Sequence, residues 1–182
     1  MPSKFIILTG STKLLHNILA MRWKEFGSVS YYPSIRDELL RHDPVGHWRN
    51  CPYFHDLVKY REIDRDREVF ALLGDSDRTV LLEEWHIGNL AWSGVEVATE
   101  EEVFQNRLLK PLYSMKSVSF QVWFVSDDLE KVAPGDEQIA YSSYLQNLSN
   151  VVKHLGLLME NIDGEAPPEF VIQRVSYLLT RS

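Results

Sequence analysis

The chain has little of what stabilises secreted, membrane or metal-clustered proteins. Its 182 residues include a single cysteine, Cys51, which excludes an internal disulfide framework and a cysteine-based zinc cluster. No apolar run approaches the roughly 20 residues that a membrane-spanning helix requires. The apolar stretch near the start is also too short for the core of a secretory signal. We therefore expect a cytoplasmic protein with no membrane partner.

Positive charge is also scarce. The sequence holds 19 Lys and Arg residues against 26 Asp and Glu residues, for a net charge of −7. Neutralising the phosphates of a duplex requires clustered Lys and Arg, so we expect no duplex nucleic-acid partner. The rest of the composition is ordinary, with 45% hydrophobic and 25% charged residues, as in a globular protein. The length predicts a single domain over residues 1–182.

Short apolar runs alternate with helical patterns along the chain. Strands are predicted at 5–8, 29–32, 79–82, 118–125 and 156–159. Helices are predicted at 15–26, 35–40, 56–73, 99–115, 141–155 and 170–179. This alternation predicts an α/β fold of three layers, α/β/α, with a five-stranded parallel sheet. Ligands of such folds bind outside the carboxyl ends of the strands, so the residues that follow each apolar run are the candidates for a binding site.

Four local patterns add detail to this scheme. The charges at 61–68 predict a solvated helix face, and a turn is expected at 161–164, after the fifth strand. Pro111 is expected to kink or end the helix that contains it. Phe170 falls on the predicted apolar face of the last helix, so we expect it to be buried.

The turn after the first strand has features of a phosphate-binding loop. Gly10 lets the backbone approach a phosphate, the following helix offers free N–H groups, and Lys13 adds positive charge. The full signature, G-x-x-x-x-G-K-[ST], is absent. Residues 10–14 correspond only to the end of this signature, so about four loop residues are missing. Leu14 stands where the signature has the hydroxyl of Ser or Thr. A simple strand–helix turn with an exposed lysine explains the same residues.

A second segment, at 83–92, resembles a known motif. It is similar to the D-R-[FWY]-H-[IL]-[GS]-E pattern of thymidylate-kinase-like and deoxynucleoside-kinase-like proteins, many of them encoded by phages. Four residues match: Trp85, His86, Ile87 and Gly88. Glu83 keeps the carboxylate where the family has Asp, Glu84 reverses the charge of the family's arginine, and Asn89 replaces the acid. The first strand with its turn, and the closing strand, turn and helix, resemble the same family.

The resemblance implies a P-loop kinase topology and a kinase activity. The expected reaction moves the γ-phosphoryl group of ATP, with Mg²⁺, to a deoxynucleoside monophosphate such as dTMP or to a related acceptor. The resemblance gives catalytic roles to Lys13 and Glu83, with Glu83 also the expected ligand of magnesium. ATP phosphates are expected to lie over Gly10, Ser11, Thr12 and Lys13. A small-molecule nucleotide is thus the expected partner, and kinases of this kind are commonly homodimers.

Acceptor-binding residues are implied in the same way. Arg36 and Arg61 are expected to bind the phosphate or sugar of the acceptor. Trp85 is expected to stack on its base, and His86 lies in the same motif. Each of these residues also has a structural explanation, as a core side chain or a solvated charge.

Two departures from the family keep other interpretations open. The lid segment at 127–137 is short and holds one lysine with five acids, which repel a triphosphate. The second departure is Glu84, which stands where the family has an arginine. Losing an arginine from such a site lowers the reaction rate by roughly 10³-fold or more. Three basic residues are candidates to replace the lost charge: Arg107, Lys110 and Lys116. The alternative is a catalytically degenerate relative that serves as a nucleotide-binding or protein-interaction module. A flavodoxin-like interaction module is a third reading, which no motif supports.

Overall fold

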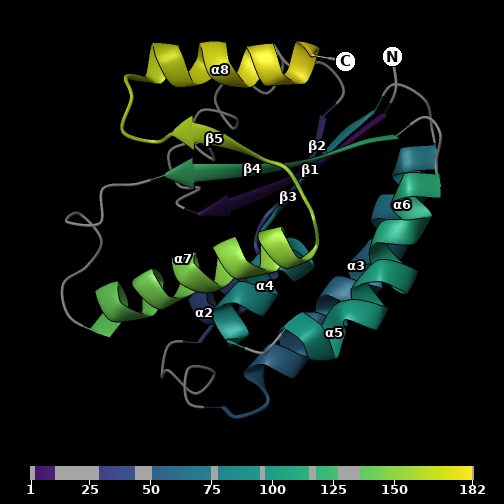
Figure 1. Cartoon of the computed structure of the whole chain (residues 1–182), viewed down its shortest axis with the longest axis vertical. Coiled ribbons are helices and arrows are strands. Elements are labelled where there is room, and N and C mark those ends of the chain that lie inside the picture. Colours follow the sequence, from purple (N-terminus) through teal and green to yellow (C-terminus); the bar gives the residue numbers. More distant parts are fainter. Residues whose placement is uncertain are drawn as a thin grey trace.

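A computed structural model gives the architecture of the chain (Figure 1). The structure describes residues 3–10, 29–43, 51–74, 78–94, 97–114, 118–126 and 136–181. Its centre is a five-stranded sheet in the order β2-β3-β1-β4-β5, and every neighbouring pair is parallel. The strands are β1 (Ser3–Gly10), β2 (Val29–Tyr32), β3 (Thr79–Glu83), β4 (Val118–Ser126) and β5 (Met159–Asp163). The predicted α/β fold with a five-stranded parallel sheet is therefore confirmed.

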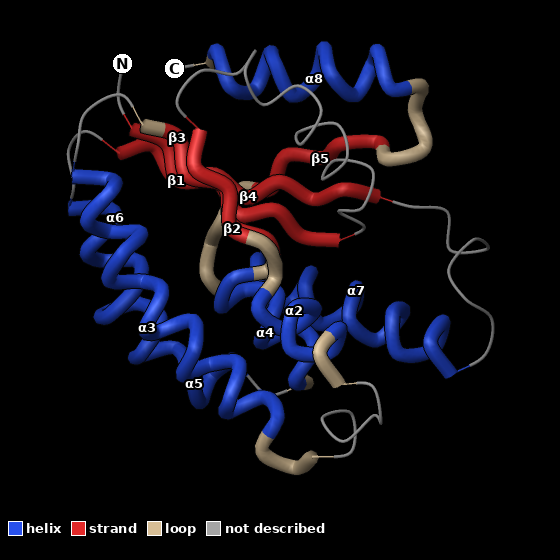
Figure 2. Tube along the Cα trace, turned by 180° about the vertical axis from the view of Figure 1, so that it is seen from behind, coloured by secondary structure: helices blue, strands red, loops and turns tan. Residues whose placement is uncertain are grey.

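Helices cover both faces of this sheet (Figures 1 and 2). One face carries α2 (Ile35–Arg41), α3 (Phe54–Gly74), α4 (Trp85–Ser93) and α7 (Asp136–His154). The same side holds a continuous helical segment made of α5 (Val97–Val103), the π-helical stretch η3 (Phe104–Leu109) and α6 (Lys110–Ser114). The opposite face is covered by α8 (Pro168–Thr180). No described helix is both long enough and apolar enough to cross a bilayer.

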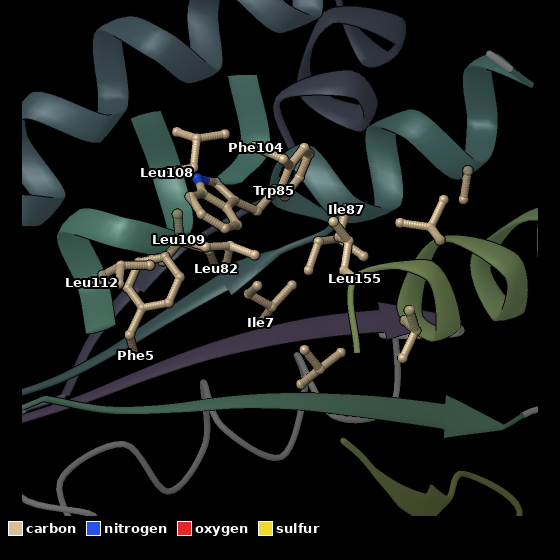
Figure 3. Close-up of a cluster of buried hydrophobic side chains, with 14 of the residues drawn as sticks. Phe5, Ile7, Leu82, Trp85, Ile87, Phe104, Leu108, Leu109, Leu112 and Leu155 are labelled. Carbon is tan, nitrogen blue, oxygen red and sulfur yellow. The ribbon is translucent and has the colours of Figure 1, made fainter. Parts of the chain in front are cut away.

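The central strand β1 shows why the runs of apolar residues form strands. Phe5 and Ile7 point into the larger core beneath α3, α4 and α7, whereas Ile6 and Leu8 point into the core beneath α8. Successive side chains of a strand alternate between faces, so a strand covered on both faces is apolar throughout. Around Trp85, the larger core is filled by aromatic and aliphatic side chains of β1, β3, η3 and α6 (Figure 3).

Lys4 joins the sheet to the last helix. Its ammonium group is buried and donates hydrogen bonds to the backbone carbonyls of Leu179 and Arg181 at the end of α8. These carbonyls have no intrahelical donors, so a cation at this end satisfies them and complements the helix dipole. The contact fixes the carboxyl end of α8 over the amino end of β1.

The predicted position of the fifth strand is wrong. Residues 156–157 close α7 instead, because Gly156 takes a left-handed φ of 65° and the N–H of Leu157 bonds to the carbonyl of Val152 at 3.0 Å. Leu158 is then 91% exposed, and β5 occupies the residues that were expected to form a turn. Its single deeply buried residue is Ile162, which accounts for the weak apolar signal of this strand.

The expectation about Phe170 fails, and the helix that contains Pro111 continues past it. Phe170 lies on the solvent side of α8 and is 63% exposed, while Val171 and Val175 face the core. Pro111 does not end its helix, which continues to Ser114. The π-helical stretch before it is bonded over five residues rather than four, as in the hydrogen bond from the Lys110 N–H to the carbonyl of Gln105.

Candidate functional site

The carboxyl ends of β1, β2 and β3 lie side by side and form the edge where the site is expected. Leu8 of β1 is in register with Glu83 of β3, so Gly10 extends just beyond the end of the neighbouring strand. Gly10 has a φ of 88°, and a side chain there would collide with the carbonyl of Val125 and the ring of Phe124. Only glycine fits this turn, which begins the predicted phosphate loop.

Glu83 ties the end of β3 to the start of α2. It is only 5% exposed, and its Oε2 accepts a hydrogen bond from the backbone N–H of Ser34 at 3.1 Å. The Ser34 side chain in turn accepts a hydrogen bond from the N–H of Asp37 and so caps α2. Glu83 therefore sits at the junction between β2 and α2, adjacent to β1, with its carboxylate held by the backbone.

Glu84 is buried as well, in a different direction. A positive φ of 62° turns its side chain away from the strand and under α4, where the Tyr144 hydroxyl donates to Oε1 and Oε2 at 3.0 and 2.9 Å. Burial is the main cause that raises the pKa of Glu84 to about 8; the nearby acids Asp37 and Glu83 contribute in the same direction, while Tyr144 and Arg36 oppose the shift. These surroundings favour the neutral form of the carboxyl group.

Asp66 of α3 organises the aromatic part of the motif. Its carboxylate is buried and accepts a hydrogen bond from Trp85 Nε1 at 2.8 Å on one oxygen, and its other oxygen lies 2.8 Å from His86 Nε2. Trp85 is completely buried, with its ring edge-on to Phe5 and Phe104. The expectation that Trp85 stacks on a base is therefore not supported, because the core covers both sides of its ring.

A second buried network lies one helical turn from Asp66. Glu62 is fully buried and forms an ion pair with Arg65, while Asn89 Nδ2 of α4 donates to its other oxygen at 3.0 Å. Arg65 also donates to the carbonyl of Pro33 at 2.7 Å. Since Glu62 Oε1 accepts from Nδ2, the amide of Asn89 is oriented, and its buried Oδ1 has no hydrogen-bond partner among the residues that the structure describes.

A cavity of about 280 Å³ opens between α3, α4 and the α5–η3 segment. Its apolar wall includes Phe70, Leu90 and Phe104, and its polar wall includes Asp66, His86 and Asn89. The Lys59 ammonium of α3 reaches across to the Glu100 carboxylate of α5, at 2.6 and 2.7 Å from its two oxygens. The volume is close to the lower end of the roughly 300–1,000 Å³ of ligand pockets.

The remaining predicted residues divide into three groups. Arg36 of α2 places its guanidinium 4.1 Å from the ring centroid of Trp92 in α4, close to the buried acids. Arg61 lies on the exposed face of α3 and does not line the cavity, which instead takes Arg67 and Arg107. Four residues lie outside the described residues: Ser11, Thr12, Lys13 and Lys116. The lid segment at 127–135 also lies outside them.

No group of three potential metal-ligating side chains occurs in the part of the chain that the structure describes. Magnesium at kinase sites is nevertheless held by only one or two carboxylates together with the phosphates of the substrate. Glu83 alone, at the strand end next to Gly10, fits that pattern. A protein-only metal centre is not supported by these residues.

Sequence reasoning missed the polar network on α3. Glu62 and Asp66 were assigned to a solvated helix face, yet the structure buries both. The signal was present in the spacing, because Val58, Glu62, Asp66, Val69 and Leu73 are all buried and follow one another at three- and four-residue steps. Acids that occupy the apolar stripe of a helix are candidates for a buried network.

The comparisons with known proteins bear on this geometry. No protein-family model matches the chain, and no curated protein matches it. Two solved structures of deoxyadenosine kinase from M. mycoides are similar. The structure with the products dCMP and a flexible dCDP bound has a TM-score of 0.61 at 11% identity, covering 97% of this chain and 98% of that one. The structure with dATP bound has a TM-score of 0.56 at 12% identity, covering 98% and 100%. The chain therefore has the same fold as these deoxyadenosine kinase structures.

Proposed function

We propose that this protein is a nucleoside or nucleotide kinase. In the proposed reaction, the γ-phosphoryl group of ATP passes to a deoxynucleoside or to a deoxynucleoside monophosphate such as dTMP. The observation that carries the proposal is the deoxynucleoside kinase fold, which extends over 97% of the chain. The polar cavity at α3 and α4 and the buried carboxylate of Glu83 support it.

The cavity is the proposed site for the nucleoside part of the acceptor. Phe70, Leu90 and Phe104 provide an apolar wall for a planar base, and His86 and Asn89 provide polar groups that hydrogen-bond to base edges. The relatives are consistent with such a ligand, since one holds dCMP and dCDP and the other dATP. His86 is held by Asp66 and Asn89 by Glu62, so both would meet a ligand already oriented.

The phosphates are proposed to lie over the turn after β1. Gly10 gives the backbone room there, and Lys13 with Ser11 and Thr12 would contact the triphosphate. Glu83 would hold magnesium, which neutralises charge on the phosphate oxygens when bound. Arg36 and Arg61 are proposed contacts of the acceptor phosphate or sugar; Arg61 would need the ligand to reach the exposed face of α3.

Nucleotide binding followed by phosphoryl transfer tests this function. Mg-ATP, dATP, deoxyadenosine or dTMP at about 100 times its dissociation constant is expected to stabilise the protein by about 2.7 kcal/mol, measured by thermal unfolding. Chromatography of the products should then reveal a phosphorylated acceptor. The transfer is expected to disappear in Lys13→Ala. Binding without transfer would favour the catalytically degenerate relative, and no binding at all would contradict the proposal.

Filling the cavity should separate acceptor binding from ATP binding. Val103→Trp adds a large ring to the cavity wall and is expected to weaken deoxynucleoside binding at least tenfold, or about 1.4 kcal/mol. ATP binding at the turn after β1 is expected to change little. The matched control is Glu102→Trp, which places the same ring on the exposed side of the same helix. Calorimetric titration measures both ligands, and equal effects of the two variants would contradict the assignment of this cavity.

A further inference from the structure

One hydrogen-bond acceptor in the wall of the cavity lacks a donor. Asn89 of α4 lines the cavity between α3, α4 and the α5–η3 segment. Its Oδ1 is buried and has no hydrogen-bond partner among the residues that the structure describes. Buried polar groups are nearly always paired, because an unpaired one loses the hydrogen bond that water would have made with it. This oxygen therefore requires a donor, which a molecule bound in the cavity can supply.

The amide of Asn89 is held so that its oxygen, and not its nitrogen, is left over. Nδ2 donates to Oε1 of the buried Glu62 at 3.0 Å. The other oxygen of Glu62 accepts from Arg65, which also donates to the carbonyl of Pro33 at 2.7 Å. Turning the amide over would place its oxygen against a carboxylate oxygen, so Asn89 is fixed as an acceptor.

The polar groups beside Asn89 accept hydrogen bonds as well. The Asp66 carboxylate accepts from Trp85 and lies 2.8 Å from Nε2 of His86. In the neutral imidazole, the proton on Nε2 faces this carboxylate, so the other ring nitrogen, Nδ1, is an acceptor. The polar wall of the cavity is therefore composed mainly of acceptors.

The side-chain donors that line the cavity are either already bonded or exposed. The Lys59 ammonium lies 2.6 and 2.7 Å from the two carboxylate oxygens of Glu100. The Ser93 hydroxyl donates to a backbone carbonyl of its own helix at 2.8 Å. Three basic lining residues are exposed: His55, Arg67 and Arg107. A ligand group that reaches the buried polar wall therefore has to donate hydrogen bonds.

We propose that Asn89 selects the base of the acceptor by accepting a hydrogen bond from an exocyclic amino group, so that cytosine and adenine bind in preference to thymine and uracil. This inference rests on the proposed function, which places a nucleoside in the cavity. Cytosine has an amino group where uracil and thymine have a carbonyl, and adenine also has an amino group on this edge. The ring N–H of uracil and thymine lies between two carbonyls, so it approaches Oδ1 only together with a competing oxygen. The proposal narrows the acceptor and removes dTMP as the preferred one.

The affinities of paired ligands test the inference. Deoxycytidine and deoxyuridine, free or as 5′-monophosphates, form the pyrimidine pair, and deoxyadenosine and purine deoxyriboside, which lacks only the amino group, form the purine pair. In the unaltered protein, calorimetric titration is expected to show about tenfold tighter binding of deoxycytidine and about fivefold tighter binding of deoxyadenosine than of their partners. Equal affinities within either pair that binds would overturn the inference, and Oδ1 would then accept from water alone.

Two variants show whether Asn89 is the residue that selects the base. Asn89→Leu keeps a side chain of similar size without the acceptor, so the preference within each pair should disappear. Glu62→Gln leaves Asn89 in place but frees its amide to turn over, so the preference should fall although the acceptor is still present. The control Asn150→Leu makes the first change at an exposed position of α7 and should keep the preference. A preference that persists in Asn89→Leu or in Glu62→Gln would overturn the inference.

The same titrations separate this inference from the proposed function. Equal binding of both members of a pair leaves a nucleoside site in the cavity and removes only the role of Asn89. No binding of any of these deoxynucleosides or monophosphates would overturn the proposed function, and the inference with it. Because the preference is a ratio of two affinities measured on one protein, a variant that is merely less stable lowers both affinities and leaves the ratio unchanged.

Discussion

Replacing Asp66 with alanine is expected to lower the free energy of unfolding by about 3–5 kcal/mol. The Asp66 carboxylate serves two buried groups, the Trp85 indole N–H and the His86 imidazole, each at 2.8 Å. Alanine leaves both without a partner in a region where Trp85 is wholly buried and His86 is 6% exposed. Urea unfolding monitored by far-UV circular dichroism measures the difference.

The same helix provides the control for this prediction. Asp64→Ala removes an acid from the exposed face of α3 and is expected to change the free energy of unfolding by no more than about 0.5 kcal/mol. Asp66→Asn keeps one acceptor oxygen and turns an amide toward the second donor, so its effect should lie between the two. If Asp66→Ala and Asp64→Ala lower the free energy of unfolding by the same amount, the two hydrogen bonds of Asp66 contribute nothing to stability.

Binding to the proposed site should respond to the same substitution. The Asp66 contact fixes His86 at the wall of the cavity. In Asp66→Asn, the imidazole has a weaker partner and more freedom, so deoxynucleoside affinity is expected to fall along with stability. Asp66 is therefore expected to act on the proposed ligand through His86.

The sheet was predictable because its strands are buried on both faces. Residues 5–8 and 80–82 are apolar without interruption, and this pattern has few explanations other than a parallel sheet between helices. β5 lies at the edge of the sheet and does not have such an apolar run. Ile162 is its one deeply buried side chain, and Leu158, just before the strand, is exposed. A strand with half of its surface in solvent gives a signal too weak to separate from a turn.

The candidate site was harder to predict because it depends on backbone conformations that residue types do not reveal. Glu84 and Trp85 have φ values of 62° and 41°, in the left-handed region that side chains rarely adopt. These two residues turn Glu84 under α4 and Trp85 into the core, whereas the motif placed Trp85 against a ligand. Strained residues of this kind concentrate at functional sites, which is consistent with a site at the end of β3.

The inward-facing arginine of α3 shows a related limit. The resemblance selected Arg61 by its place in the chain, but Arg65, one turn later, is the residue that reaches the end of β2. Residues four apart lie on nearly the same face of a helix, but Arg61 is exposed whereas the Arg65 side chain is 10% exposed and contacts the residue after β2. The role of Arg61 as a contact of the acceptor stays a prediction.

Replacing Gly88 with alanine is expected to destabilise the protein by about 2–4 kcal/mol, the reverse of its usual effect in a helix. Alanine is favoured over glycine inside a helix by roughly 1 kcal/mol. Here, however, the added Cβ would lie 2.7 Å from the Glu84 carboxyl carbon and 2.9 Å from its Cβ. Real Cβ atoms do not approach other atoms that closely, so the buried carboxyl must move away from Tyr144. Thermal and urea unfolding of the two proteins measure the net effect.

A second substitution shows whether this collision is the cause. Glu84→Gly removes the side chain that the new methyl group meets and also suits the positive φ at that position. The double variant Glu84→Gly and Gly88→Ala should therefore lose less stability than the sum of the two single variants, by about 1–3 kcal/mol. Additive losses would mean that Gly88 is required for another reason, such as close packing of α4 on its neighbours. A positive coupling would explain in physical terms why glycine is needed at this place in the motif: the helix must leave room for an acid that reaches Tyr144, whose hydroxyl also accepts from the Gly10 N–H of the first strand.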